Sequence, residues 1–394
     1  MTPGARTQAA IEILDQVIEA ARGGGAAADT LIARYFAARR YAGSKDRRAV
    51  RELVYAAIRR AGEVPERGRA AMVGLARDDS AVAAMFDGSP HGPAPIAADE
   101  PAAKAGTAPA WIGKRFKASG IDAAEAAALV ERAPLDLRVN LLKCADPATL
   151  FGDLGAERLA DLPQALRLPS GTSIEASEAF RDGLVEVQDA GSQVVTLAAK
   201  AAPGVTVIDL CAGAGGKSLA LAAMMANAGV VLATDTDRGR LSRLPPRAER
   251  AGASIIETRL LNPNAEAEAL ADWRDRADVV LIDAPCSGTG TWRRNPEARW
   301  RLTPTRIERL VDTQRRLLGI AAPLVRPGGA LVYIVCSLLD EEGAGQIDRF
   351  LVDHPGWGVE EPIAQGRPRG QGKRLTPLHD ATDGFFVARL IRAC

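Results

Sequence analysis

The sequence predicts an α/β protein in which residues 191–394 form a doubly wound parallel sheet. Two observations carry this prediction. Apolar segments without internal alternation recur between segments of helical periodicity, and a glycine-rich turn follows the first of these apolar segments and opens a helix. Strands that alternate with helices are typical of parallel sheets covered on both faces. The expected strands are 206–210, 230–233, 254–257, 278–282, 330–335 and 385–391, and the expected helices lie near 216–228, 237–251, 303–322 and 340–353.

The remaining sequence predicts two further domains. The chain has 394 residues, which is too long for one compact core. Residues 1–107 are helical in pattern, with apolar positions such as Ile11, Leu14 and Ile18 at helical spacing. Residues 108–190 combine two expected helices with alternating segments, which favours a small α+β connecting domain ahead of the sheet at 191–394.

Composition excludes several classes of protein. The net charge is +1, so no overall positive field indicates a nucleic-acid partner. The cysteines, Cys144, Cys211, Cys286, Cys336 and Cys394, are odd in number and form no CxxC pair, which argues against a disulfide framework and a zinc site. The sequence shows no signal peptide and no long apolar window free of charge. We therefore expect a cytoplasmic monomer without a metal or a membrane partner.

Two candidate reactive thiols follow two of the expected strands. The strand at 278–282 ends in Asp283, and Pro285 prevents the chain from continuing a central ladder. Cys286 comes directly after this proline, and a later strand ends in Cys336. Ligands of open α/β sheets bind at the carboxyl ends of the strands. The carboxylate and the two thiols are therefore candidates for one active site.

The glycine-rich turn after the first strand permits three interpretations. A Walker A loop requires a glycine where Cys211 stands, and a dinucleotide fingerprint requires one where Ser218 stands, so both patterns fail. The remaining interpretation is an S-adenosylmethionine loop, which begins with an acidic residue, here Asp209, followed by small residues and glycines. A glycine turn without a ligand is the alternative. The candidate cofactor contacts in this loop are Cys211, Ala212, Gly213, Ala214, Gly215, Gly216 and Lys217.

An acidic residue at the end of the second strand supports the cofactor interpretation. Asp235 stands there, and a carboxylate can accept hydrogen bonds from both ribose hydroxyls of an adenosyl group. Methyl transfer to carbon 5 of a pyrimidine would further require a nucleophilic thiol, a base and a group that binds ring nitrogen 3. Cys336, Cys286 and Asp283 could fill these roles, although Asp283 could also serve only as a strand-end carboxylate.

Several motifs resemble the Sun/Fmu-type RNA cytosine-5 methyltransferases. They are Asp-Ala-Pro-Cys-Ser-Gly-Thr-Gly at 283–290, Arg-Arg-Asn-Pro at 293–296, Tyr-Ile-Val-Cys-Ser at 333–337 and Asp-Gly-Phe-Phe at 383–386. Residues 46–55 are similar to the NusB-like helical RNA-binding domain of the bacterial rRNA branch. The resemblance implies a Rossmann-like class I methyltransferase domain, S-adenosylmethionine as cofactor and RNA as substrate, with 16S rRNA favoured.

The resemblance also implies roles for individual residues. Cys336 matches the family's nucleophile, Cys286 matches the cysteine that helps to release the product, and Asp283 lines the cofactor or base pocket. The family places an aspartate near the adenine after the third strand, where this sequence has Asn262. We expect Asn262 to take that position. Methylation of tRNA and RNA binding without catalysis are the alternatives.

Two basic segments are candidate RNA contacts. Residues 292–301 contain four arginines and two tryptophans, which can bind phosphates and stack on bases. Arg293, Arg294 and Arg299 are the expected contacts, unless the segment is a packed loop. Residues 365–374 are basic and glycine-rich, and would either clamp RNA or form a solvated loop.

Overall fold

The computed structural model describes residues 1–144, 146, 150 and 155–394. The chain divides into two compact units, and each is described by itself. The first unit consists of residues 1–131 and 291–303, and the second of residues 132–290 and 304–394. The chain thus leaves the second unit directly after the candidate catalytic loop and returns at the first residue of a long helix.

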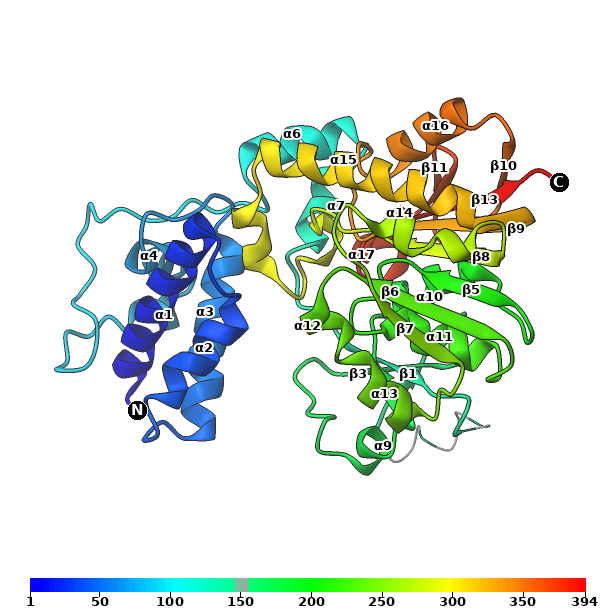
Figure 1. Cartoon of the computed structure of the whole chain (residues 1–394). Coiled ribbons are helices and arrows are strands. Elements are labelled where there is room, and N and C mark those ends of the chain that lie inside the picture. Colours follow the sequence, from blue (N-terminus) through cyan, green and yellow to red (C-terminus); the bar gives the residue numbers. More distant parts are fainter. Residues whose placement is uncertain (145, 147–149, 151–154) are drawn as a thin grey trace. The chain divides into compact units, whose positions relative to one another are not determined.

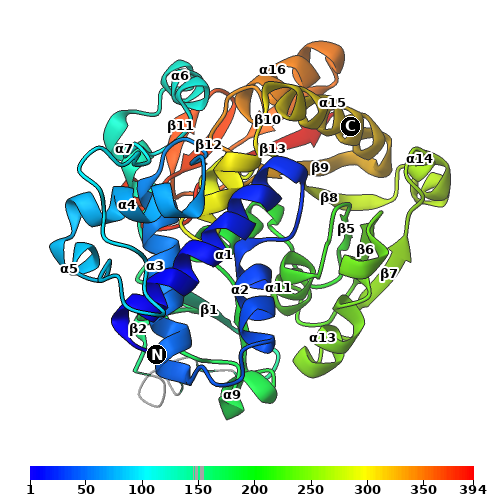
Figure 2. The ribbon, with the colours of Figure 1, turned by 90° about the vertical axis from the view of Figure 1, so that its left-hand side faces the viewer.

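The first unit is helical, as its sequence pattern predicts. Its longest helix, α1, has Thr2 as N-cap, with the hydroxyl accepting from the Ala5 amide at 3.2 Å, and ends at Gly24 in the left-handed conformation. One face of α1 is buried against α2 and α3, which lie beside it in Figure 2. The helices are α1 (Pro3–Gly23), α2 (Ala28–Ala37), α3 (Ser44–Arg60), α4 (Gly68–Asp78), α5 (Ser80–Ala83), α6 (Ala110–Ala118) and α7 (Ala123–Ala128).

The segment that follows the catalytic loop is packed into this helical unit. Trp300 belongs to the unit's core, and its indole donates to the Ala61 carbonyl at 3.1 Å. Trp292 is fully buried, with its ring 5.4 Å from that of Phe116. Arg293 is only 8% exposed, and Arg294 is half-buried. The packed-loop alternative therefore describes most of this segment.

Arg299, an expected RNA contact, is fully buried and caps α3. Its Nη2 donates to the carbonyls of Ile58 at 2.6 Å, Arg59 at 3.1 Å and Ala61 at 2.9 Å. These carbonyls lie at the carboxyl end of the helix, where backbone acceptors lack helical partners and a positive charge is favourable. Burial lowers the pKa of Arg299 to about 9. This placement gives the guanidinium a structural role and leaves it inaccessible to phosphate.

The second unit begins with a small antiparallel sheet in the order β2-β3-β1-β4. Its strands are β1 (Leu135–Val139), β2 (Glu157–Arg158), β3 (Ala165–Leu168) and β4 (Val185–Val187). The segment 108–190, expected to form one connecting domain, is divided between the units, because α6 and α7 belong to the first and these strands to the second.

The large sheet has the order β11-β12-β13-β9-β8-β5-β6-β7, with β10 pairing β13 (Figure 1). The expected parallel arrangement is confirmed for β5 to β9, but β13 runs antiparallel to β9. The sequence pattern of β13 could not reveal its direction, because both of its faces are buried. The strands are β5 (Thr206–Asp209), β6 (Val230–Asp235), β7 (Ile256–Leu260), β8 (Ala277–Asp283), β9 (Val325–Val335), β10 (Trp357–Glu360), β11 (Arg367–Arg369), β12 (Gly372–Leu375) and β13 (Phe385–Arg392).

Helices cover both faces of this sheet. Along β8, Val280 and Ile282 pack on the face covered by α15 and α16, whereas Val279 and Leu281 pack on the face covered by α10 and α11. The helix expected near 303–322 is α15, and Pro304 is its first residue. Within the described residues, no helix is both long and apolar enough to cross a bilayer. The helices are α9 (Glu178–Arg181), α10 (Ala190–Thr196), α11 (Gly216–Met224), α12 (Arg238–Leu241), α13 (Leu244–Ala251), α14 (Glu266–Ala269), α15 (Pro304–Ala321), α16 (Ala344–Asp353) and α17 (Pro377–Asp380).

The basic segment 365–374 forms the hairpin of β11 and β12 rather than a solvated loop. Arg369 donates to Asp340 through Nε at 2.9 Å, and Arg374 donates to the same carboxylate at 2.7 Å. Arg374 is also buried. These arginines therefore fasten the hairpin to the loop after β9, an arrangement that the glycine content of the segment did not indicate.

Replacement of the buried guanidinium should destabilise the protein. Arg299→Ala removes one shared donor from the carbonyls of Ile58, Arg59 and Ala61 and opens a cavity, which should cost about 3 kcal/mol. Thermal unfolding of the intact chain should show a midpoint several degrees lower than for Arg48→Ala, which removes an exposed arginine from α3. Equal midpoints for the two variants would contradict the capping role.

Candidate active site

The two candidate thiols meet at the carboxyl edge of the parallel sheet. Strands β8 and β9 are parallel neighbours in a register that pairs Asp283 with Ile334. Cys286 and Cys336 follow the ends of these strands, and their Sγ atoms lie 3.3 Å apart. Both residues are half-buried. Residues fifty positions apart in the sequence thus form one contact.

The surroundings of this pair favour a proton on Cys286. The hydrogen bond with Cys336, followed by burial, raises the pKa of Cys286 well above that of a free thiol. Either sulfur can be the donor in this contact. Because a thiolate is the nucleophilic form of cysteine, the raised pKa makes Cys286 the weaker candidate for the attacking sulfur.

Asp283 is held in place by Lys217. The Lys217 Nζ donates to Asp283 Oδ2 at 2.7 Å and to the Ser192 hydroxyl at 3.2 Å. Burial by itself would lower the pKa of Lys217, but the charge and hydrogen bond of Asp283 outweigh it and raise that pKa. The lysine is therefore a permanent cation, and the partly exposed Asp283 carboxylate faces the edge of the sheet with a fixed orientation.

The glycine loop is fastened to Asp235. The Gly213 amide donates to Asp235 Oδ2 at 2.8 Å, and Asp235 Oδ1 accepts from the Asp237 amide at 2.7 Å. Gly213 and Gly215 have φ values of 56° and 84°, a region that favours glycine. A Cβ at Gly213 would lie 2.4 Å from the Arg240 guanidinium. The loop conformation therefore depends on both glycines.

Asp209, the first residue of the loop, is a buried carboxylate. Its Oδ2 accepts from the Ser218 hydroxyl at 2.7 Å, whereas Oδ1 has no hydrogen-bond partner among the described residues. Burial, assisted by the charges of Asp283 and Asp235, raises the pKa of Asp209 to about 7. The hydrogen bond from Ser218 opposes this shift but does not cancel it.

These residues surround a pocket of about 320 Å³. Its wall includes Cys211 after β5, Asp235 at the end of β6, Asp283 and Cys286 after β8, and Cys336 after β9. The structure thus brings together the expected catalytic residues and three of the expected cofactor contacts, because Asp283 was expected in both roles. The other expected loop residues lie outside the lining of this pocket, and they are Ala212, Gly213, Ala214, Gly215, Gly216 and Lys217.

The third expected strand contributes a residue that sequence reasoning missed. Asn262 is exposed and lies outside the pocket lining, and its carbonyl accepts from the Ala265 amide at 3.0 Å. Glu266, the first residue of α14, is 3% exposed and lines the pocket. The sequence signal for this residue is an acidic side chain four positions beyond Asn262, outside the strand end itself.

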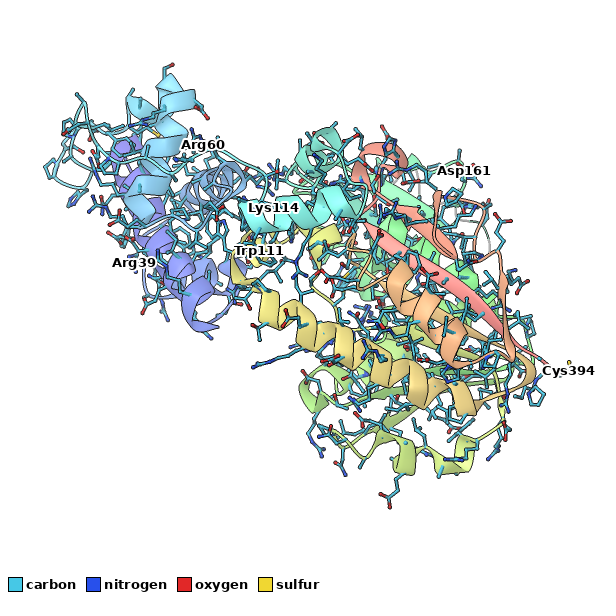
Figure 3. All side chains as sticks on the ribbon, turned by 90° about the horizontal axis from the view of Figure 1, so that it is seen from above. Arg39, Arg60, Trp111, Lys114, Asp161 and Cys394 are labelled. Atoms are coloured by element: carbon cyan, nitrogen blue, oxygen red, sulfur yellow. The ribbon has the colours of Figure 1, made fainter. Side chains whose placement is uncertain are left out.

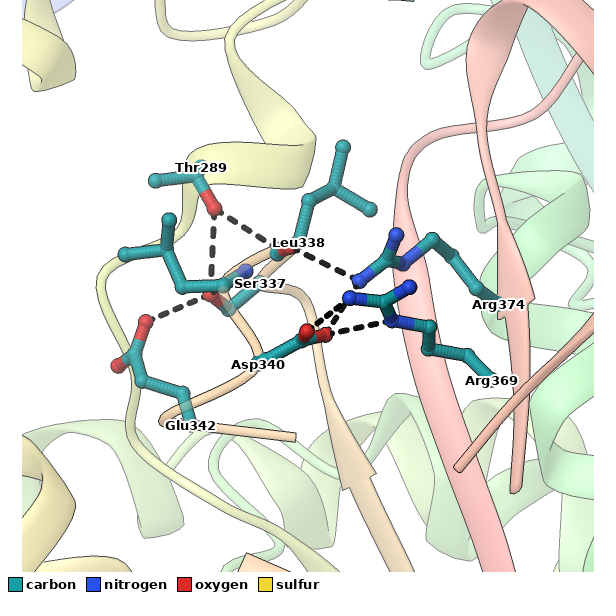
Figure 4. A network of polar contacts seen from close by, with 8 residues as sticks. Thr289, Ser337, Leu338, Asp340, Glu342, Arg369 and Arg374 are labelled. Atoms are coloured by element: carbon teal, nitrogen blue, oxygen red, sulfur yellow. Dashed lines mark hydrogen bonds and ion pairs between the residues drawn. The ribbon is translucent and has the colours of Figure 1, made fainter. Parts of the chain in front are cut away.

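A second carboxylate that sequence reasoning missed joins the two thiol loops, and Figure 4 shows its contact with Ser337. Glu342 is fully buried and accepts from the Ser287 amide at 2.8 Å and from the Ser337 hydroxyl at 2.6 Å. The Ser287 hydroxyl donates to it as well, and Gln314 Nε2 donates at 3.1 Å. Ser287 and Ser337 each follow one of the candidate thiols. Glu342 therefore cross-links the backbone positions that set the separation of the two sulfurs.

Close backbone packing completes this cross-link. The Gly290 amide donates to the Cys336 carbonyl at 3.0 Å, and the Gly384 amide donates to the Gly290 carbonyl at 2.8 Å. A Cβ at Gly290 would lie 2.1 Å from the Gly384 carbonyl oxygen. The Leu338 amide donates to the Thr289 hydroxyl at 2.9 Å (Figure 4). The Asp-Gly-Phe-Phe motif thus supports the loop that carries Cys286.

The other cysteines do not join the thiol pair. Burial raises the pKa of Cys211 well above that of a free thiol, so this pocket residue stays protonated. Cys394 is exposed at the end of the chain (Figure 3). In the part of the chain that the structure describes, no group of three or more His, Cys, Asp or Glu side chains could hold a metal ion.

The sheet and the pocket at its carboxyl edge define a Rossmann-like methyltransferase. A family model described as 16S rRNA methyltransferase RsmB/F matches residues 195–391, which is half of the chain. The chain belongs to this family of RsmB/F methyltransferases.

Relatives and solved structures agree with this assignment. Ribosomal RNA small subunit methyltransferase B of Sodalis glossinidius is 35% identical over 72% of this chain and 65% of its own length. The crystal structure of PH0851 is 25% identical and covers 99% of both chains with a TM-score of 0.79. NSun6 from Pyrococcus horikoshii with SFG has the same fold, at 22% identity over 72% of this chain and 97% of its own, with a TM-score of 0.64. The matching region spans 60 to 65% of the length of the first curated relatives.

Asp209 should make stability depend on pH. Because its pKa is raised to about 7, the folded protein holds a proton that the unfolded chain releases near pH 4. Stability is therefore fully present below pH 4 and falls as the pH rises to 7, by at most about 4 kcal/mol. Asp209→Asn keeps an acceptor for Ser218 and should remove this loss.

Unfolding free energies at pH 5 and pH 8 measure the effect. The difference in unfolding free energy between Asp209→Asn and the wild type should favour the variant more at pH 8 than at pH 5. Asp312→Asn, on the exposed side of α15, should show no such difference. An equal effect of Asp209→Asn at both pH values would contradict the raised pKa.

Loss of the Glu342 charge should loosen the thiol loops. Glu342→Gln provides one acceptor oxygen where the carboxylate provides two. The NH₂ group of the glutamine would face the hydroxyl and amide groups that donate to Glu342, and it cannot accept from them. We expect a loss of about 2 kcal/mol in unfolding free energy and faster reaction of the native thiols with a disulfide reagent. Glu341→Gln changes the neighbouring, half-buried glutamate and is the matched control. If both variants behave alike, Glu342 does not hold the loops.

Proposed function

We propose that the protein transfers a methyl group from S-adenosylmethionine to carbon 5 of a cytosine in RNA, with 16S rRNA as the substrate. The observation that carries the proposal is the 3.3 Å contact between the Cys286 and Cys336 sulfurs on the wall of the pocket. Pyrimidine carbon 5 is a poor nucleophile, and a thiol beside a methyl-donor pocket is the arrangement that activates it. Membership of the RsmB/F family supports rRNA as the substrate.

The residues of the pocket fit S-adenosylmethionine. A volume of about 320 Å³ lies in the range of small-molecule sites. Asp235 would accept from the ribose hydroxyls, the loop of residues 211–217 would lie along the amino-acid part, and Asp283 would lie near the reacting end. The cofactor supplies an electrophilic methyl group on a sulfonium. The structure of the P. horikoshii NSun6 carries SFG, an S-adenosylmethionine analogue, and has the same fold.

Cys336 would act first, by forming a bond between its Sγ and carbon 6 of the cytosine. The electrons of the carbon 5–carbon 6 double bond move toward nitrogen 3, which takes a proton, and carbon 5 becomes an enamine carbon. Carbon 5 then takes the methyl group. Loss of the carbon 5 proton to solvent and cleavage of the Sγ–carbon 6 bond return the Cys336 thiolate, and nitrogen 3 then gives up the proton it took, which restores the neutral aromatic ring.

Asp283 would act in the first step of this reaction, and Cys286 would act in the last. The Asp283 carboxylate, fixed by Lys217, would accept from the cytosine amino group and from protonated nitrogen 3. The Cys286 thiol is protonated and lies next to Cys336. It would donate a hydrogen bond to the Cys336 sulfur as the bond between that sulfur and carbon 6 breaks. This division of labour leaves attack to Cys336 and product release to Cys286.

We propose that the helical unit binds RNA as a NusB-like domain. Arginine and lysine side chains are exposed along α2 and α3, and Tyr41 between these helices is 75% exposed, as a base-stacking side chain should be. Arg293 and Arg294 follow the catalytic loop and remain proposed contacts. Arg299 is not among them, because its guanidinium is bonded to the carbonyls at the end of α3. The exposed basic residues are Arg34, Arg40, Lys45, Arg47, Arg48 and Arg51.

The two thiols should give opposite phenotypes. Cys336→Ala should abolish both methyl transfer and covalent RNA adducts, because it removes the attacking sulfur. Cys286→Ala should slow release and accumulate an adduct, visible as a retarded protein–RNA band on a denaturing gel. Cys394→Ser, which changes an exposed cysteine, should behave as the wild type. Adducts in Cys336→Ala but not in Cys286→Ala would assign the attack to Cys286.

The substrate is tested with radioactive S-adenosylmethionine and unmodified RNAs. Label in 16S rRNA, located at a cytosine by bisulfite sequencing, is the expected result. Label in tRNA alone would show that tRNA is the substrate instead of 16S rRNA. Absence of label in every cellular RNA would indicate a protein that binds RNA without methylating it.

A further inference from the structure

We propose that Glu266 recognises the adenine amino group of the cofactor, the role that the sequence led us to expect of Asn262. The inference rests on the proposed function, because it takes S-adenosylmethionine as the occupant of the pocket. Its evidence lies in the order of residues along the pocket and in the hydrogen bonding of Glu266 itself.

Glu266 and the thiol pair lie on different sides of Asp235 along the edge of the sheet. The strand order β9-β8-β5-β6-β7 places Cys336 and Cys286 at one end, Asp235 at β6, and α14 with Glu266 after β7. All four residues line the same pocket. Among the acidic residues of the pocket wall, Glu266 therefore follows the strand that is farthest from the thiols in the strand order.

Covalent connectivity places the adenine at the Glu266 end. The reacting methyl group must lie beside the thiols, and the ribose and then the adenine follow the sulfonium along the molecule. With the ribose hydroxyls at Asp235, the adenine extends toward β7. The 6-amino group of adenine is a hydrogen-bond donor, so its subsite needs an acceptor.

The Glu266 carboxylate has an oxygen for that donor. Its Oε2 accepts from Arg316 Nη1 at 2.7 Å, whereas Oε1 is buried without a hydrogen-bond partner among the described residues. A buried, unpartnered carboxylate oxygen is costly, and a donor from a ligand would remove that cost. A small turn about the last, weakly restrained torsion of glutamate can present Oε1 to the pocket. A hydrogen bond from the amino group to a carboxylate would be charge-assisted.

The ion pair with Arg316 allows a test by inversion of specificity. In Glu266→Gln, Arg316 would bind the amide oxygen and leave the amide NH₂ facing the base. This NH₂ repels the adenine amino group but can donate to the 6-oxo group of hypoxanthine. The wild type should therefore bind S-adenosylhomocysteine more tightly than S-inosylhomocysteine, by roughly tenfold to hundredfold, and Glu266→Gln should lose or reverse this preference.

Calorimetric titration of the full chain with both nucleosides measures the two dissociation constants without any turnover. Glu268→Gln, which changes an exposed glutamate of the same short helix, should keep the wild-type preference. Wild-type protein that binds the two nucleosides equally would overturn the inference, whether or not Glu266→Gln folds. Unchanged preference in a folded Glu266→Gln would also overturn it.

Failure of the proposed function gives a different pattern. In that case the wild type binds neither nucleoside and transfers no methyl group to RNA. Binding of S-adenosylhomocysteine without discrimination at the 6-position leaves the function in place and removes only the role of Glu266.

Discussion

The active site depends on the parallel pairing of β8 with β9. The register that pairs Asp283 with Ile334 brings the ends of the two strands to the same edge of the sheet, and the sulfurs that follow them to 3.3 Å. A slip of one residue would turn every side chain of one strand to the opposite face. Both faces of β8 are buried. A slip would therefore expose none of its apolar side chains to water, but it would misplace Cys286. The register is therefore specified by packing shape and by the Glu342 cross-link, rather than by hydrophobicity.

The helical unit is connected to this site through the chain itself. Gly290 bonds to the loop of Cys336 and to Gly384, and the next residue, Thr291, already belongs to the first unit. Trp300 and Arg299 then fix the segment among the helices by hydrogen bonds to the end of α3. The helical unit, which we propose as an RNA-binding domain, is thus one peptide bond from the candidate catalytic loop.

Local features of the site could be predicted from the sequence, and contacts between distant residues could not. Pro285 and the apolar run before it are sufficient to place Asp283 and Cys286 at a strand end, and the glycines reveal the loop before α11. The direction of β13, the burial of Arg299 and the position of Glu342 depend on which elements become neighbours in space. Arginine is the clearest case, because a guanidinium satisfies helix carbonyls and RNA phosphates with the same donors, and composition alone cannot distinguish the two.

The charges around the pocket connect the raised pKa of Asp209 with the proposed cofactor. Asp235 and Asp283 lie near enough to Asp209 to disfavour its ionisation, and Lys217 only partly compensates them. Glu266 adds a fourth carboxylate to the same region. In the proposed function, the sulfonium and ammonium groups of S-adenosylmethionine bring positive charge toward Asp209, Asp235 and Asp283 and relieve their mutual repulsion. In that proposal, S-adenosylmethionine carries the sulfonium charge that its product lacks, so these acids would favour the methyl donor over the product and promote exchange after each transfer.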